Sequence, residues 1–211
     1  NSRYFGWAEN DWHHLGRGTA IGHMLECAGQ LTGGYFADPG VKDVPGLARL
    51  GFPIAEVRSD GTATFSKVAG TGGELSVRTC TEQLLYEIFD PSTYLQPDVT
   101  ADFSGVTFTQ SADGIRMDGA TGRERPERLK VSVGYKDGYI GEGQISYAGP
   151  GAVARGRLAL EIVRERLALR ELAIEELRLE LIGVDATNFT SGPPSELREV
   201  RIRAAGRSRQ R

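Results

Sequence analysis

Three residues that can carry acid–base or nucleophilic chemistry lie within five consecutive positions, namely His23, Glu26 and Cys27. Residues three and four apart are neighbours on a helix, so the imidazole could reach both the carboxylate and the thiol. A histidine beside a cysteine can lower the pKa of the thiol and make it a nucleophile. The spacing therefore predicts His23, Glu26 and Cys27 as candidate catalytic residues. Replacing His23 or Cys27 by Ala is expected to abolish turnover and leave the fold intact.

Two other interpretations of these residues stay open. Together with His13 or His14 they could form a metal site of mixed nitrogen, sulfur and oxygen ligands. Their spacing matches no common zinc pattern, however, so we assign no metal ligand. A polar stripe on one helix is usually a solvated face, with Cys27 as a small buried residue. The second cysteine, Cys80, lies inside an apparent helix cap and is expected to be structural.

Glycine-rich turns offer backbone N–H groups that could bind an anion. One is the run 70–73, and another, 149–151, opens a predicted helix whose dipole favours a negative group. The candidate anion-binding residues are Thr71, Gly72, Gly73, Gly149 and Gly151. Neither turn is followed by the Gly-Lys-Ser or Gly-Lys-Thr of a Walker loop, and tight turns without a ligand are the alternative.

These residues would be positioned by about three helices. Apolar residues recur at helical spacing over residues 18–31, with Gly33-Gly34 as the stop signal. A second helix is predicted to begin at a capping box over 79–82 and to end at Asp90-Pro91. A third runs from 149 to about 169. Its core stripe is predicted to consist of Val153, Leu158, Ile162, Val163 and Leu167.

Hairpins account for most of the predicted strands. Turns that end in Asp-Gly, each flanked by runs of β-forming residues, are strong short hairpin signals. They predict the pairs 54–58 with 62–66, 106–110 with 115–118, and 131–135 with 139–147. Gly141 and Gly143 in the last run indicate a bulge or a close backbone approach. Alternating residues over 177–181 and 200–204 predict a further strand pair, and 185–196 a loop. The fold class is therefore α+β, with a mixed or largely antiparallel sheet built from hairpins.

Composition narrows the possible partners of this chain of 211 residues. The net charge of −3 gives no reason to expect a nucleic-acid partner. No apolar run is long enough to cross a bilayer, so no membrane partner is expected. Two cysteines are too few for a disulfide framework and indicate a reducing, cytoplasmic setting. The first residue is not Met, which indicates a processed, truncated or incompletely traced chain.

Several segments resemble the acyclic terpene utilisation family, the AtuA-like proteins. The matching segments are residues 22–34, 51–57, 70–73, 81–88, 147–150 and 181–184. Members of that family are longer and begin with a glycine-rich α/β region. The resemblance thus implies that residues 1–184 are the C-terminal portion of an AtuA-like domain whose N-terminal half is a missing partner. Residues 185–211 would form a loop, an edge strand and a frayed basic tail.

The resemblance also implies a role. The family is linked to the breakdown of citronellol- and geraniol-type compounds through coenzyme A thioesters, and it supplies no catalytic residues to carry over. We expect a catabolic protein that binds or transforms a branched acyl-CoA, with its cofactor unassigned. One alternative is a non-enzymatic scaffold or subunit of a terpenoid-degradation assembly, and a homo-oligomer is possible. The other is metal-dependent hydrolase or lyase chemistry that uses the histidine cluster.

Overall fold

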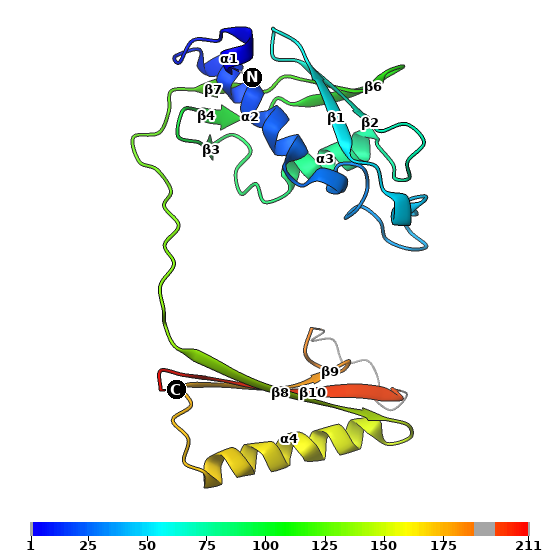
Figure 1. The fold of residues 1–211 in the computed structure, drawn as a ribbon, viewed down its shortest axis with the longest axis vertical. Helices are drawn as coiled ribbons and strands as arrows, with labels where there is room; N and C mark the ends of the chain where they lie inside the picture. Colours follow the sequence, from blue (N-terminus) through cyan, green and yellow to red (C-terminus); the bar gives the residue numbers. More distant parts are fainter. Residues whose placement is uncertain (1, 188–196, 211) are drawn as a thin grey trace. The chain divides into compact units, whose positions relative to one another are not determined.

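The computed structural model describes residues 2–187 and 197–210, which divide into two compact units, Asn1–Ser132 and Val133–Arg211 (Figure 1). The described residues form four α-helices and three antiparallel sheets. The predicted α+β class is confirmed. The strands are divided among three sheets, and the first compact unit ends at Ser132.

The first unit is organised around one long helix. A short helix α1 (Ser2–Phe5) precedes α2 (Trp12–Glu26), whose N-cap Asp11 accepts a hydrogen bond from the His14 N–H. The helix begins six residues before the predicted start because Asp11 caps it there. It ends at Glu26, and a short 3-10 turn, η1 (Ala28–Gln30), follows it.

Two predicted hairpins of the first unit are confirmed and share one sheet. Strands β1 (Pro53–Val57) and β2 (Ala63–Lys67) form the first hairpin, and β5 (Thr107–Ser111) and β6 (Gly114–Asp118) form the second. Pairing of β2 with β6 joins them in the order β1-β2-β6-β5. A short 3-10 helix, η2 (Leu47–Arg49), lies before β1.

A smaller sheet and a second helix complete this unit. Strands β3 (Tyr94–Leu95), β4 (Thr100–Asp102) and β7 (Thr121–Arg123) pair in that order. Helix α3 (Val77–Leu85) begins with a capping box made by Ser76 and Thr79, three residues before the predicted one. The Ser76 hydroxyl accepts from the Thr79 N–H, so the cap that forms lies one turn earlier in the chain.

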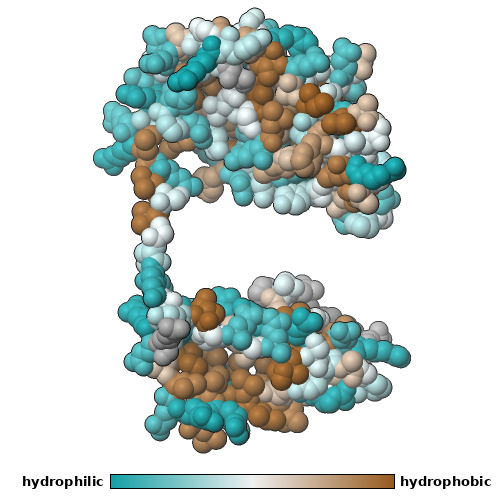
Figure 2. Space-filling model, viewed as in Figure 1, coloured by the Kyte–Doolittle hydropathy of each residue, from teal (hydrophilic) through white to brown (hydrophobic). Residues whose placement is uncertain are grey.

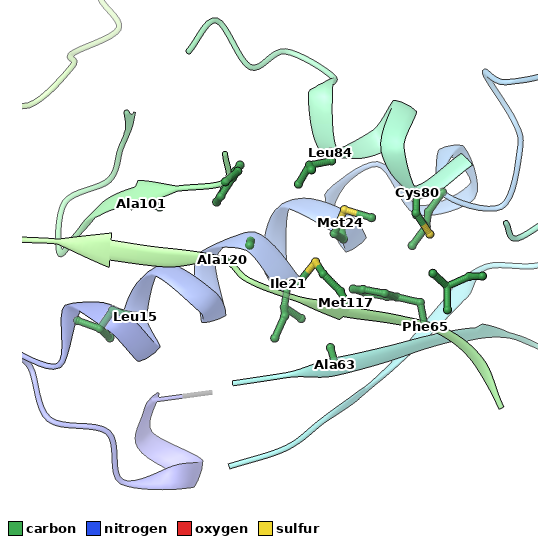
Figure 3. Packing of buried hydrophobic residues seen from close by; sticks show 14 of the residues in the cluster. Leu15, Ile21, Met24, Ala63, Phe65, Cys80, Leu84, Ala101, Met117 and Ala120 are labelled. Atoms are coloured by element: carbon green, nitrogen blue, oxygen red, sulfur yellow. The ribbon is translucent and has the colours of Figure 1, made fainter. Parts of the chain in front are cut away.

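The core of the first unit surrounds α2. Figure 3 shows Ile21 and Met24 of this helix directed toward Phe65 and Met117 of the larger sheet and toward α3. All four side chains are at most 2% exposed. Because α2 contacts β1, β4, β7 and α3, most of its circumference is covered by protein.

The second unit is a three-stranded sheet with one helix. Strands β8 (Tyr139–Ala148), β9 (Glu176–Ile182) and β10 (Glu199–Ser208) have the order β8-β10-β9, and α4 (Ala152–Leu169) packs on the sheet. The predicted pairing of 177–181 with 200–204 is confirmed. The predicted edge strand and frayed tail are wrong, since β10 is the middle strand and includes residues 206–208. The predicted loop 185–196 lies mostly outside the described residues.

The third predicted hairpin is also wrong. Residues 131–135 form no strand, and β8 pairs along its whole length with β10 instead. Arg207 of β10 holds Asp137 at 2.6 Å, so the Asp-Gly dipeptide lies beside β10 rather than at a hairpin turn. A distant strand therefore outcompetes the local turn signal.

Helix α4 rests on the sheet through its small residues. Ala152 and Gly156 are buried against Leu181 and Val200. An added Cβ at Gly156 would lie 2.6 Å from Leu181 Cδ1, so a larger residue there would require the buried Leu181 side chain to move. This orientation leaves Leu158 and Ile162, predicted as core residues, 56% and 51% exposed.

Candidate functional site

His23 is a core residue rather than part of a solvated stripe. Its side chain is only 4% exposed and its ring stacks on Phe103, with centroids 5.7 Å apart. Its Nε2 lies 3.2 Å from the carbonyl oxygen of Leu84 at the end of α3, so Nε2 carries the proton and donates. The other ring nitrogen, Nδ1, is buried without a hydrogen-bond partner among the described residues.

The structure brings Glu26 near this nitrogen. Glu26 Oε2 lies 3.8 Å from His23 Nδ1, beyond hydrogen-bond distance, and the Glu26 side chain is 65% exposed. A water molecule could bridge the two groups, or a modest movement of Glu26 could bring them into direct contact. His23 and Glu26 thus form a pair that could exchange a proton at the end of α2.

Cys27 is not paired with His23. It is a partly buried free thiol, and no hydrogen bond joins it to the imidazole. Cys27 lies near Tyr86, whose pKa is raised first by the negative charge of Glu87, then by desolvation, and to a lesser extent by Tyr35 and Cys27. The predicted activation of the Cys27 thiol by His23 therefore has no geometric support in this conformation.

The three histidines do not converge. His13 Nδ1 lies 2.8 Å from the Thr121 hydroxyl and His14 Nδ1 lies 2.7 Å from Asp11, both in the first turn of α2. His23, ten residues further along, is about 15 Å away along the helix axis. Within the described ranges, no group of three His, Cys, Asp or Glu side chains is placed to hold a metal ion. Cys80 is fully buried, and desolvation raises its pKa to about 12, as expected for a structural thiol.

The glycine turn at 70–73 uses its donors internally. The N–H of Gly72 donates to the carbonyl of Arg49 at 2.8 Å, and that of Gly73 donates to Pro45 at 2.7 Å. The Thr71 hydroxyl donates to the Val68 carbonyl. These contacts favour the alternative of a tight turn, and binding of an anion there would require the turn to open.

Arg155 of α4 occupies the turn at 149–151. The Gly149 N–H donates to the Arg198 carbonyl at 2.7 Å. The Arg155 guanidinium donates to the carbonyls of Ala148 and Pro150 at 2.7 and 2.9 Å. Gly151 is the N-cap of α4, with a φ of 80°. Anion binding at Gly149 and Gly151 stays a prediction.

The second unit contains an apolar groove that no predicted site residue lines. It has a volume of about 580 Å³ and lies between the sheet and the C-terminal half of α4. Its floor is made of directly paired small residues, because Gly143 faces Ala204 and Gly141 faces Gly206 across β8 and β10. Apolar side chains form the walls, and these are Val163, Leu167, Leu172, Ile174 and Leu177. Figure 2 shows apolar surface gathered between α4 and the sheet.

The groove exists because β8 has no side chain at two successive positions on this face, Gly141 and Gly143. A Cβ added at Gly141 or Gly143 would meet nothing within 4 Å. The strand pairs with β10 in one uninterrupted register, so these glycines mark no bulge. The two glycines are thus the sequence feature that marks the groove, and they mark an open space rather than the predicted bulge. The volume is within the range of about 300–1,000 Å³ that is typical of small-molecule sites.

These observations define an α+β protein of two compact units, one of which contains an apolar groove of ligand size. The chain belongs to the acyclic terpene utilisation family AtuA, because the family's sequence model matches residues 2–211. The match extends beyond the predicted limit at Val184 and includes residues 185–211. No curated protein and no solved structure matches the chain. Membership implies a role in acyclic terpene utilisation. No helix in the described part of the chain is long and apolar enough to cross a membrane.

Proposed function

We propose that the chain takes part in the breakdown of acyclic terpenoids or related branched acyl-CoA compounds by binding, or binding and transforming, a coenzyme A thioester. The observation that carries this proposal is the apolar groove of the second unit, in a chain of the acyclic terpene utilisation family. A methyl-branched hydrocarbon chain is the part of such a thioester that gains most from leaving water.

The dimensions of the groove support an extended chain. Its floor follows β8 from Tyr139 to Gly143, four residues apart, which corresponds to roughly 13 Å of strand. Aliphatic walls on α4 and on the segment before β9 would shield the bound chain. The coenzyme itself would remain largely outside, since the groove is mostly apolar and has few groups that could pair with several phosphates.

A transformation would need reactive groups in addition to the groove. His23, Glu26 and Cys27 are the proposed reactive residues, and they lie in the first unit, so their role is tested separately from binding. The two free thiols, Cys27 and Cys80, agree with a cytoplasmic location, where coenzyme A thioesters are formed and consumed.

Calorimetric titration of the full chain with geranyl-CoA, citronellyl-CoA and free CoA tests the proposal. We expect micromolar binding of both thioesters and weaker binding of CoA, since CoA lacks the hydrocarbon chain. An absence of heat with all three compounds, at concentrations that reach the millimolar range, would contradict the proposal.

An alternative is a non-enzymatic scaffold or subunit of a terpenoid-degradation assembly. The outer stripe of α4 favours it, since Leu158, Ile162 and Leu169 are 56%, 51% and 80% exposed on one side of the helix. If this stripe is a subunit interface, charged substitutions in it should change the mass of the assembly measured by sedimentation and leave the affinity for the thioester unchanged. The reverse pattern, with lost affinity and unchanged mass, would exclude the scaffold.

A further inference from the structure

The apolar groove has a polar end and an apolar end. Tyr139 and Ser208 are directly paired across β8 and β10, and their side chains lie on the same face of the sheet as Gly141 and Gly206. Gln210 lines the same end of the groove. At the opposite end the floor consists of Gly143 and Ala204. An amphipathic ligand would therefore have one favourable orientation, with its polar group toward Tyr139.

A lysine that contacts Tyr139, but does not itself line the groove, adds positive charge near the polar end. The Lys136 ammonium donates to the Tyr139 hydroxyl at 3.0 Å and lies 4.9 Å from the centroid of the Tyr139 ring. Among the residues that the structure describes, no carboxylate forms an ion pair with Lys136. The nearest acidic residue in sequence, Asp137, is held by Arg207 at 2.6 Å. The charge of Lys136 is consequently available to a ligand.

The other charges around this end are already paired with one another. Arg207 contacts Glu175 and Glu176 as well as Asp137, and Arg209 contacts Glu175 at 3.5 Å. This network lies on the opposite face of the sheet from the groove, because Arg207 alternates with Gly206 and Ser208. Lys136, by contrast, contacts Tyr139, and the Tyr139 side chain lines the groove.

We propose that Lys136 and Tyr139 bind the acidic or carbonyl end of a methyl-branched aliphatic acid or its thioester, while the hydrocarbon chain lies over Gly141 and Gly143. This inference rests on the proposed function for the thioester but also applies to the free acid. The ammonium and the phenol hydroxyl would each donate to the ligand's oxygen atoms. The bare glycine floor would accommodate methyl branches that side chains at these positions would exclude.

The glycine floor allows a variant that separates binding from folding. A valine at position 143 places its side chain in the empty groove, and valine is favoured over glycine in a strand. We therefore expect Gly143→Val to be at least as stable as the wild type and yet to bind the chain at least tenfold more weakly. Gly134→Val is the matched control, because its added Cβ also meets nothing within 4 Å and position 134 does not line the groove.

A second variant tests the polar end. The full chain and its Lys136→Gln variant are titrated with citronellate, with citronellol and with citronellyl-CoA. The wild type should bind the acid about threefold to tenfold more tightly than the alcohol, as expected for a charge-assisted contact at an exposed lysine. Lys136→Gln should remove this difference and leave the affinity for the alcohol unchanged. The acid and the thioester arms distinguish a free carboxylate from a coenzyme-bound ligand.

The outcomes separate this inference from the proposed function. If citronellyl-CoA binds the wild type and both variants equally, the groove site is wrong and the proposed function stands. If citronellate binds and Gly143→Val abolishes its binding while no thioester binds, the groove site stands and the proposed function falls. If Lys136→Gln weakens acid and alcohol alike, the headgroup site is wrong. If no probe binds the wild type, both proposals are overturned.

Discussion

Replacing Gly16 by Ala tests how closely α2 packs on β7. An alanine in a helix is normally more stable than a glycine by about 1 kcal/mol. At position 16, however, the added Cβ would lie 2.1 Å from the Thr121 carbonyl oxygen and 2.7 Å from the Gly122 nitrogen. Both atoms belong to the backbone of β7, so no flexible side chain can move aside.

The expected magnitude follows from these opposing contributions. Overpacking in a well-filled interior costs about 1–3 kcal/mol, which exceeds the gain in helix propensity. Gly16→Ala should therefore destabilise the first unit, by up to about 2 kcal/mol. Gly22 provides a control on the same helix, because its added Cβ meets nothing within 4 Å and the residue is exposed. Gly22→Ala should stabilise the unit by about 0.5–1 kcal/mol.

Thermal unfolding followed by circular dichroism measures both changes. For a unit of this size, 1 kcal/mol corresponds to roughly 3–5 °C in Tm. The two single variants should thus shift the transition of the first unit in opposite directions. A Gly16→Ala variant that is as stable as Gly22→Ala would refute the close contact between α2 and β7.

The remaining predictions concern titratable groups of the first unit. Iodoacetamide in the native state should alkylate Cys27 and spare Cys80, since burial raises the pKa of Cys80 to about 12; peptide mass spectrometry that finds Cys80 modified first would contradict this burial. The burial of His23 contradicts the expectation that its replacement by Ala leaves the fold intact. His23→Ala should destabilise the unit by about 2–4 kcal/mol in urea unfolding, because the ring packs on Phe103, and a variant as stable as the wild type would contradict this burial. The backbone N–H and hydroxyl of Thr62 donate to Asp60 and lower its pKa below 3.8, so the contribution of Asp60 to stability is present above pH 3.8 and is lost as the pH falls further. In urea unfolding between pH 5 and 2, Asp60→Asn should therefore lose less stability than the wild type.

The fold was predictable where local signals act alone. The turn at Ser59-Asp60-Gly61 forms the predicted hairpin, because the two strands that it joins also pair with each other. The turn at Asp137-Gly138 carries the same signal but fails. Its second strand pairs with residues 51 to 69 positions later in the chain, and no local pattern can reveal that competition.

The candidate site shows the same limit. The helical spacing of His23 and Glu26 correctly placed them near each other, at 3.8 Å. It could not show that α2 is covered on several sides, which buries His23 in the core. The groove depends on the register between β8 and β10, so the role of Gly143 opposite Ala204 could not be predicted from β8 alone.

The strand order of the second unit also determines when this unit can fold during synthesis. Strands β8 and β9 each pair with β10 and not with each other, so neither has its partner until residues 199–208 have been made. The strands described in the first unit, by contrast, pair with one another within residues 53–123, so their sheets do not wait for later parts of this chain. Until residues 199–208 have been made, β8, with its exposed Ile140 and Ile145, remains an unpaired strand with which other chains could pair. Slowing translation between β8 and β10 is consequently expected to reduce the yield of soluble protein more than the same delay within the first unit.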